Sequence, residues 1–468
     1  MTTAAEKKRW WALIVLCLGV LMIVLDTTIV NVALPSIRVD LGFTESSLAW
    51  VVNAYLLTFG GFLLLGGRLG YLFGHRRMFL LGLILFTVSS LLCGLSSTQW
   101  FLIVARAVQG LGGAIVDAVA LSLTMNLFQG VHERAKAMGV FGFVAAGGGS
   151  IGVLLGGLLT TVNWHWIFLV NIPIGIAVFI FSLLLLSGER IKLANRHIDT
   201  WGAVTVTASL IVANYAIVGG NAAGWLSTQT LGELALAVCL LGAFIWIESR
   251  VRAPLMPLHM FLSRNIAVAN IVGVLWAAAM FAWFFISALY MQLVLHYTPL
   301  QVGLSFLPAN LIMEIFSLGI SAKLVERFGI KIPLAVGLFT ASLGLALFVR
   351  ARVDGHFVTD LLPSMILLGI GAGMAFNPVL LAAMNDVPQD ESGLASGLVN
   401  TSFMMGGALG LAILASLAAS RTGALAASGI GQIAALNGGY HAAFLTGALF
   451  AALAAILGAT LLRPQQQQ

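Results

Sequence analysis

The chain has 468 residues, of which 60% are hydrophobic and 9% are charged, and its formal net charge is +6. Soluble domains carry about 25% charged residues, so this composition excludes an ordinary soluble protein and indicates a polytopic membrane protein. The basic residues are spread over short loops, which favours control of membrane topology and contact with anionic lipid over a nucleic-acid surface.

Apolar runs of about 20 residues predict an all-α membrane protein with fourteen transmembrane helices. The first run follows Lys7, Lys8 and Arg9 and is too long for the apolar region of a signal peptide, so we expect it to be retained. The predicted spans are 11–34, 48–71, 77–95, 100–128, 135–160, 164–187, 199–219, 228–249, 265–291, 301–324, 330–350, 361–384, 393–419 and 439–462.

The basic residues predict the orientation of these spans. With the N-terminus inside, seventeen of the 23 Lys and Arg residues fall on the cytoplasmic side and four on the other, while Arg68 and Arg106 fall within predicted helices. Because Lys and Arg are enriched in cytoplasmic loops, we expect both termini in the cytoplasm.

Four charged residues lie inside predicted spans, away from their ends: Asp26, Arg106, Asp117 and Glu314. Each costs about 2.5–3.5 kcal/mol at the centre of a bilayer, so each needs water or a partner. At about 1.5 Å per residue, Asp26 lies roughly 22 Å from the inner edge of the membrane core, on a helix that runs outward. Arg106 lies about 9 Å from the outer edge of a core of about 30 Å, on a helix that runs inward. These depths nearly coincide, so we predict that Asp26 and Arg106 interact. The pair either locks two helices together or changes its geometry with protonation.

The other two acids are on polar faces of their predicted helices. Asp117 shares a face with Arg106 and two glycines, and Glu314 shares one with Asn310, Ser317 and Ser321. Such faces are too polar for lipid, so we expect them to meet the protein interior or an aqueous cavity. Each acid either binds a cation or a proton there or is a static group with a local hydrogen bond.

An aromatic stripe in the span 265–291 is a candidate pocket lining. Aromatic faces attract cations, and methionine adapts to varied shapes. The alternative is that these side chains pack in the core or face lipid. The stripe comprises Trp276, Met280, Trp283, Ser287 and Tyr290.

Two cytoplasmic turns resemble each other and predict an internal repeat. Both turns combine glycines with basic residues after a predicted helix: GRLGYLFGHRR at 67–77 and GISAKLVERFGIK at 319–331.

A second glycine pattern, at Gly148, Gly152 and Gly156, permits close helix approach. We interpret it as a sliding contact between two halves of the protein, with static packing as the alternative.

No enzyme chemistry is indicated by the sequence. Cys17, Cys93 and Cys239 lie far apart in apolar runs, without disulfide or metal-ligand spacing. A phosphate-binding G-x-x-x-x-G-K-[ST] motif is missing, and no catalytic triad or metal cluster is suggested. We therefore predict neither an enzyme nor a bound cofactor or metal.

Several strings resemble the 14-helix drug/proton antiporters of the major facilitator superfamily. LDTTIVNVALP at 25–35 is similar to their first-helix signature, and RAVQG at 106–110 to their R-x-x-Q-G motif. The glycines from Gly148 to Gly157 resemble their antiporter motif. WHWIFLVNIPIG at 164–175 and NTSFMMGGALG at 400–410 occupy corresponding places.

The resemblance implies a major facilitator fold. It consists of a six-helix half at 1–190, two inserted helices at 191–252, and an amphipathic linker with a second six-helix half at 253–468. It implies a proton-coupled exporter of amphipathic, cationic drugs that works by alternating access, and we expect a monomer in the cytoplasmic membrane of a bacterium. The partners would be protons, the lipid bilayer and the small-molecule substrate. An exporter of a specific metabolite, siderophore or lipid is the alternative, and a non-transporting receptor or scaffold is a third.

The residues themselves and the resemblance together predict roles for particular positions, although the role of Asp117 has no precedent in the family. An acid in the helix of Glu314 is linked to cationic substrates in this family. Proton coupling would involve Asp26, Arg106, Asp117 and Glu314. Substrate binding would involve Glu314, Asp117, Asn310, Trp276, Met280, Trp283 and Tyr290. Gating would involve Gly67, Gly74, Arg76, Arg77, Gly148, Gly152 and Gly156.

The chain departs from the family pattern at several positions. Tyr71 replaces the usual Asp of the turn after the second helix, and Val153 replaces a proline. Asp117 stands where a small or apolar residue is usual. Phe403 and Met404 replace a commonly polar pair.

Overall fold

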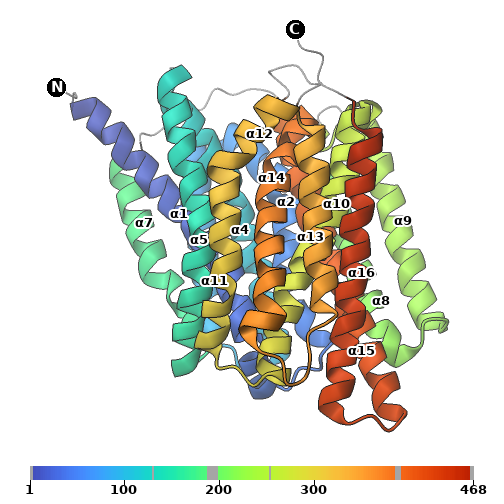
Figure 1. The fold of residues 1–468 in the computed structure, drawn as a ribbon. Helices are drawn as coiled ribbons and strands as arrows, with labels where there is room; N and C mark the ends of the chain where they lie inside the picture. Colours follow the sequence, from blue (N-terminus) through green and yellow to red (C-terminus); the bar gives the residue numbers. More distant parts are fainter. Residues whose placement is uncertain (1–3, 129–130, 187–198, 252–253, 385–391, 464–468) are drawn as a thin grey trace.

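The computed structural model describes residues 4–128, 131–186, 199–251, 254–384 and 392–463. Within these residues, fourteen helices are long and apolar enough to cross a membrane, which confirms the predicted number of spans. The start of α1 and the end of α16 lie at the same end of the bundle (Figure 1), as an even number of spans requires. The helices are α1 (Ala4–Leu41), α2 (Trp50–Phe73), α3 (His75–Gly94), α4 (Gln99–Leu127), α5 (Val131–Val162), α6 (Trp166–Leu169), α7 (Asn171–Leu185), α8 (Thr200–Ala223), α9 (Thr228–Arg250), α10 (Arg264–Leu289), α11 (Pro299–Ile315), α12 (Ser321–Phe328), α13 (Lys331–Phe348), α14 (Leu362–Met384), α15 (Ser392–Ala427) and α16 (Gln432–Leu461).

Short helical segments precede, follow or connect several of these helices. They are η1 (Ser47–Ala49) before α2, η2 (Leu258–Leu262) before α10, η3 (Tyr290–Val294) after α10, η4 (Phe316–Ile320) between α11 and α12, and η5 (Phe357–Leu361) before α14. The largest differences from the predicted spans are at the ends: α1 runs from Ala4 to Leu41, α15 continues to Ala427, and α16 begins at Gln432.

Local sequence explains several helix ends. Thr98, Ser227 and Thr298 accept hydrogen bonds from backbone N–H groups of the first turns of α4, α9 and α11, which otherwise lack partners. Gly74 separates α2 from α3 with a φ of 94°, a conformation that residues with a Cβ rarely adopt. The sharp turn at this predicted gating glycine therefore has a conformational explanation.

The helices form two groups that meet along two seams. α1 to α5 and α7 pack among themselves, as do α10, α11 and α13 to α16. Between the groups, α5 packs on α11 and α2 packs on α15. The inserted pair α8 and α9 lies at one side (Figure 1), where α8 contacts both α2 and α15. The predicted boundaries at 190/191 and 252/253 fall outside the described residues.

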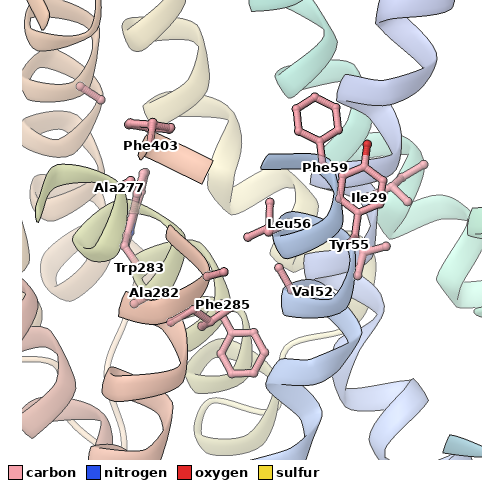
Figure 2. Packing of buried hydrophobic residues seen from close by; sticks show 14 of the residues in the cluster. Ile29, Val52, Tyr55, Leu56, Phe59, Ala277, Ala282, Trp283, Phe285 and Phe403 are labelled. Carbon is pink, nitrogen blue, oxygen red and sulfur yellow. The ribbon is translucent and has the colours of Figure 1, made fainter. Parts of the chain in front are cut away.

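A hydrophobic cluster runs through both groups. Tyr55, Leu56 and Phe59 of α2 and Trp283 and Phe285 of α10 belong to the same cluster (Figure 2). The glycines allow close contact across the seams: a Cβ on Gly60 of α2 would lie 3.0 Å from the Met404 Cβ of α15.

The segment before α10 packs on protein. Met260 is buried in a cluster with Ile266, Ala395 and Leu398, and Met256 packs against that cluster. The predicted interfacial linker therefore also has contacts with α15, while Leu262 is 87% exposed.

Candidate functional site

A buried ion pair joins α1 and α4. The Arg106 Nη1 lies 2.5 Å from the Asp26 Oδ2, and both side chains are at most 1% exposed. The contact predicted from the depths of the two residues is therefore confirmed. Because an unpaired buried charge is strongly unfavourable, this pair has to be surrounded by further partners.

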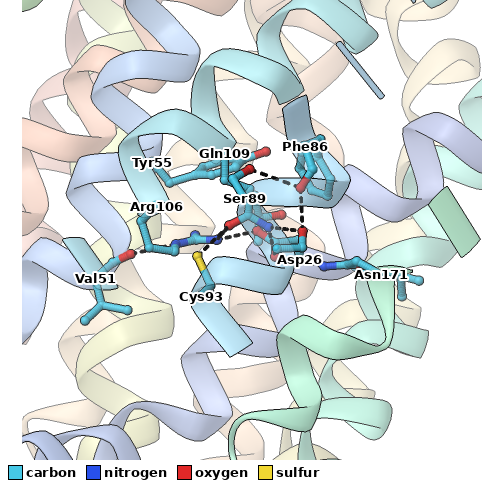
Figure 3. A network of polar contacts seen from close by, with 12 residues as sticks. Asp26, Val51, Tyr55, Phe86, Ser89, Cys93, Arg106, Gln109 and Asn171 are labelled. Carbon is cyan, nitrogen blue, oxygen red and sulfur yellow. Dashed lines mark hydrogen bonds and ion pairs between the residues drawn. The ribbon is translucent and has the colours of Figure 1, made fainter. Parts of the chain in front are cut away.

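Polar side chains from α4 and α7 complete the partners of Asp26 (Figure 3). Its Oδ1 accepts hydrogen bonds from Gln109 Nε2 of α4 at 2.8 Å and from Asn171 Nδ2 of α7 at 3.1 Å. Gln109 also accepts a bond from Arg106 at 2.7 Å and donates to Ser90 of α3 at 2.8 Å. The carboxylate thus has charged and neutral donors on two sides.

Arg106 is held from the side of α2. Its Nε donates to the backbone carbonyl of Val51 at 3.0 Å, and its guanidinium lies 4.4 Å from the ring centre of Tyr55. Phe168 of α6 covers it at 5.6 Å. Aromatic faces stabilise a desolvated cation. The pair, Ser90, Gln109 and Asn171 are called the α1–α4 network below.

Sequence reasoning missed three members of this network. Gln109 follows Arg106 by three residues, a spacing that places both on one helix face, and it is part of the R-x-x-Q-G string. Asn171 lies in the WHWIFLVNIPIG string. Ser90 had no signal, because a serine in an apolar helix usually bonds its own backbone.

Glu314 makes a hydrogen bond across the α5–α11 seam. The Ser150 hydroxyl donates to its Oε1 at 2.6 Å. Ser150 is buried, whereas Glu314 is half-buried and lies midway along the Pro299–Phe328 span. On the same helix face Asn310 and Ser321 are buried, which confirms that this polar stripe faces the protein.

Asp117 is not part of the α1–α4 network. It is half-buried on α4, and no side chain of the described residues donates a hydrogen bond to it. Within the same residues, no hydrogen bond joins it to a group that also contacts Glu314. A shared site for these two acids therefore stays a prediction.

The aromatic stripe of α10 is buried. Trp276, Trp283 and Tyr290 are at most 2% exposed, so an orientation towards lipid is wrong for these three; Met280 is half-buried. The indole N–H groups of both tryptophans have no hydrogen-bond partner among the described residues. Tyr290 donates to the Arg352 carbonyl at 2.7 Å, which gives it a structural role at the end of the helix.

Two further features of the C-terminal group are an unpartnered buried amide and a small cavity. Asn310 is 2% exposed, and both its amide nitrogen and its amide oxygen lack partners among the described residues. Trp276 lines a cavity of about 10 Å³, the space that about one water needs, together with Phe376, Asn400 and Phe403. The predicted substrate residues thus include buried polar groups without partners among the described residues, and their role in substrate binding stays a prediction.

The glycine stripe of α5 does not contact the partner group of helices. A Cβ on Gly148, Gly152 or Gly156 would meet Val24, Thr28 or Ile29 of α1, within the same group. The predicted contact between halves is wrong for this face, because the stripe is rotated away from α11. The seam uses Gly157, whose Cβ would lie 2.9 Å from Leu300, and Val153, whose carbonyl faces Gly303.

The turn between α2 and α3 contacts its own group of helices. Arg76 donates to the Leu183 carbonyl of α7 at 2.8 Å, whereas Arg77 is exposed. The Arg68 guanidinium lies 5.8 Å from the ring centre of Tyr71, the residue that replaces the family's usual Asp. Gly67 has space beside it, because a Cβ there would lie 3.9 Å from the Ala118 Cβ. Gating by this turn stays a prediction.

Known membrane transporters and resistance proteins are similar to this chain in sequence. A profile described as Major Facilitator Superfamily matches residues 16–411. The chain is 37% identical to the puromycin resistance protein pur8 of Streptomyces alboniger, over 90% of this chain and 84% of that protein. It is 36% identical to the cephamycin export protein CmcT of Amycolatopsis lactamdurans, over 90% and 87%. It is 34% identical to the multidrug resistance protein Stp of Mycobacterium tuberculosis H37Rv, over 89% and 77%.

Solved structures with low sequence identity share the fold. The POT family transporter PepTSo has a TM-score of 0.69 with 15% identity over 97% of each chain. The partially occluded inward-open xylose transporter XylE from E. coli has a TM-score of 0.65 with 14% identity over 99% of each chain. Since the family profile covers most of the chain and its relatives exceed 30% identity, the chain belongs to the Major Facilitator Superfamily and is a multi-pass membrane transporter, not an enzyme.

Proposed function

We propose that this protein exports amphipathic, cationic toxic compounds in exchange for protons, by alternating access. The names of three relatives support the export of drugs: puromycin resistance protein, cephamycin export protein and multidrug resistance protein. Proton coupling and a cationic substrate rest on the environment of the acids inside the spans.

The observation that carries the proposal is the hydrogen bond between Ser150 and Glu314. It joins α5 to α11, and these helices belong to the two groups that alternating access would rock against each other. An ionised carboxylate accepts such a bond more strongly than a neutral acid does. Protonation of Glu314 therefore weakens this connection, and separation of the seam in turn alters proton affinity at Glu314.

The α1–α4 network provides a second proton-sensitive connection. Asp26 accepts bonds from Arg106, Gln109 and Asn171, so the ionised form of Asp26 is held by all its partners. A proton on Asp26 would remove the charge that holds Arg106 and would loosen α1 from α4 and α7. This change would stay within the N-terminal group and would complement the change at the seam.

The buried polar groups of α10 and α11 are the proposed substrate contacts. Leaving a buried donor or acceptor unpaired costs about 1–3 kcal/mol, and a ligand or water that pairs with it recovers that energy. Trp276, Trp283 and Asn310 present such groups. The indole faces add cation–π attraction, while Glu314 supplies the negative charge for a cationic substrate.

The pH gradient drives this exchange. One proton exchanged for one monovalent cation moves no net charge across the membrane, so the membrane potential contributes nothing to that step. A tenfold ratio of proton concentrations corresponds to about 1.4 kcal/mol and sustains up to about a tenfold substrate gradient. A second proton per cycle would move one net charge, which yields about 2.3 kcal/mol per 100 mV.

Transport in vesicles tests the proposal. Purified protein in proteoliposomes should move ethidium, a lipophilic cation, against its gradient when a pH gradient is imposed, and should release protons in return. Glu314→Gln should reduce this flux at least about tenfold, the effect of losing about 1.4 kcal/mol at the coupling step. Glu326→Gln is the matched control, because Glu326 is exposed on α12.

Equal pH-driven flux in the wild type and in Glu314→Gln would remove Glu314 from the coupling mechanism. The name of the cephamycin exporter supports a second candidate function, the export of one specific metabolite. Transport of a single antibiotic with no flux of ethidium or puromycin would favour that function.

A further inference from the structure

Two buried carboxyl groups meet at the base of the inserted helices α8 and α9. Asp199 is 3% exposed and Glu248 is 4% exposed, and their side chains lie within hydrogen-bonding contact of each other. A Cβ on Gly202 would lie 2.5 Å from Asp199 Oδ2 and 2.8 Å from Glu248 Oε1. The glycine thus leaves the space in which these two oxygens come together.

The two facing oxygens lack a donor. Neither Asp199 Oδ2 nor Glu248 Oε1 has a hydrogen-bond partner that can donate among the described residues. Two carboxylates in contact away from water cannot both stay ionised, because the repulsion between them is not screened. One proton between these oxygens removes that repulsion and supplies both with their missing hydrogen bond.

The second carboxyl oxygen of Asp199, Oδ1, indicates which of the two groups carries the proton. Asp199 is the N-cap of α8, and its Oδ1 accepts the Gly202 N–H at 2.8 Å. A helix N-terminus favours the ionised form of a carboxyl group. The proton therefore belongs on Glu248 Oε1, which donates to Asp199 Oδ2.

The same pair holds the connection to the C-terminal group of helices. Glu248 Oε2 accepts the backbone N–H of Met256 at 3.2 Å, and a second backbone bond comes from Leu255. Leu255 is buried with Leu65 and Ala203, so this stretch is packed between α2 and α8. It continues through η2 into α10, the helix that carries Trp276 and Trp283.

Other charged groups near the pair are few. Among the described residues, Asp199 is the one charged group that acts electrostatically on Glu248. Arg250 of α9 lies over the Trp246 ring, and Arg68 of α2 lies over Tyr71. The facing residues of α2 and α15 are apolar.

Two further basic groups lie in the stretch that follows Met256, namely His259 of η2 and Arg264 of α10. Arg196, His197 and Arg252 are close in sequence to Asp199 or Met256 and lie outside the described residues.

We propose that Asp199 and Glu248 form a binding site for one proton that keeps residues 254–257 docked on α8 and α9. Loss of this proton leaves two carboxylates in contact, which repel each other and release the Met256 N–H. The site is at the end of α8 and α9 nearest the chain termini and is distinct from Asp26, Asp117 and Glu314. It does not depend on the proposed drug export.

Infrared spectroscopy and hydrogen exchange on the full-length protein in lipid nanodiscs test this proposal. The wild type should show the C=O band of a protonated carboxylic acid that disappears on alkalinisation. Over the same pH interval, exchange of the Met256 amide, corrected for intrinsic rates, should accelerate at least about tenfold. Glu248→Gln should lack this part of the band, and its amide N–H, which replaces the shared proton, should keep Met256 protected at every pH.

Two variants keep the test decisive. Asp199→Asn retains the helix cap, since Asn caps as well as Asp, and should also remove the pH dependence of Met256 exchange. Glu233→Gln, at the other end of α9, should behave as the wild type, because Glu233 bonds only the neighbouring Gln229 among the described residues. The proposal is overturned if Glu248→Gln and Asp199→Asn both retain the titrating band, or if Met256 exchange in the wild type does not change with pH. Transport measurements do not enter either result.

Discussion

Buried polar groups are paired to different extents in the α1–α4 network and on the polar face of α10 and α11, although the amide oxygen of Asn171 in the network also has no partner among the described residues. In the network, the charges of Asp26 and Arg106 are paired, and Gln109 and Asn171 fill the remaining positions around the carboxylate. On the second face, Asn310 and Trp283 are equally buried, yet their polar atoms have no partners among the described residues. The first arrangement pairs the two charges with each other, whereas the second leaves polar atoms unpaired, and a role for those atoms in substrate binding stays a proposal.

Removing the cation of the network should have the largest effect. Arg106→Met leaves the buried carboxylate of Asp26 without its charge partner, which costs about 3–5 kcal/mol. We expect a large decrease in melting temperature in detergent, measured by intrinsic fluorescence. The double variant Asp26→Asn with Arg106→Met should recover part of this loss, because no unpaired charge remains. A wild-type melting temperature for Arg106→Met would show that the network does not stabilise the fold.

A glycine in each region gives a matched pair of variants. A Cβ on Gly110 of α4 would lie 2.2 Å from Thr58 Oγ1 and 2.4 Å from the Tyr55 carbonyl, so Gly110→Ala should destabilise by about 1–3 kcal/mol. A Cβ on Gly273 of α10 would meet only Val379 and Val399, at 3.7 and 3.9 Å. Gly273→Ala should therefore be neutral or stabilise by up to about 1 kcal/mol, through its higher helix propensity. Thermal unfolding measures both, and equal losses would contradict the comparison.

The same substitution at two asparagines should have different results. Asn171→Leu removes a hydrogen bond to Asp26 and should destabilise by about 1–3 kcal/mol. Asn310→Leu removes a buried amide that has no partners among the described residues and should leave the melting temperature unchanged or raise it. Equilibrium binding of ethidium, followed by fluorescence, should weaken only in Asn310→Leu. Unchanged binding in that variant would exclude Asn310 from the substrate site.

The smallest effect on stability is expected at the seam. Ser150→Ala removes one hydrogen bond to Glu314, which contributes about 0.5–1.5 kcal/mol. Loss of this connection between α5 and α11 should lower the rate of pH-driven ethidium transport in proteoliposomes. Thr160→Ala is a control on the same helix, because the Thr160 hydroxyl makes no hydrogen bond among the described residues. A transport rate unchanged by Ser150→Ala would separate Ser150 from coupling.

Hydropathy, charge and short motifs were enough to predict the spans, the family and one contact of the site. The spans follow from the length of apolar runs, because only about 20 apolar residues in a helix cross the hydrocarbon core. The pairing of Asp26 with Arg106 followed from depth, since the rise per residue fixes how far along a helix each charge lies. These quantities depend on position along one axis and need no knowledge of neighbouring helices.

Which side chains meet depends instead on how the helices are rotated and packed. The glycines of α5 were expected at the seam but face α1, and Ser150, two residues before Gly152, bonds Glu314 instead. Many of these helices are apolar around most of their circumference, so their sequences give little information about rotation about the helix axis. Asn171 and Asp26 are 145 residues apart in the chain, a separation that no helix period relates. Their contact depends on the packing of several helices at once, which fixes rotation and neighbours together.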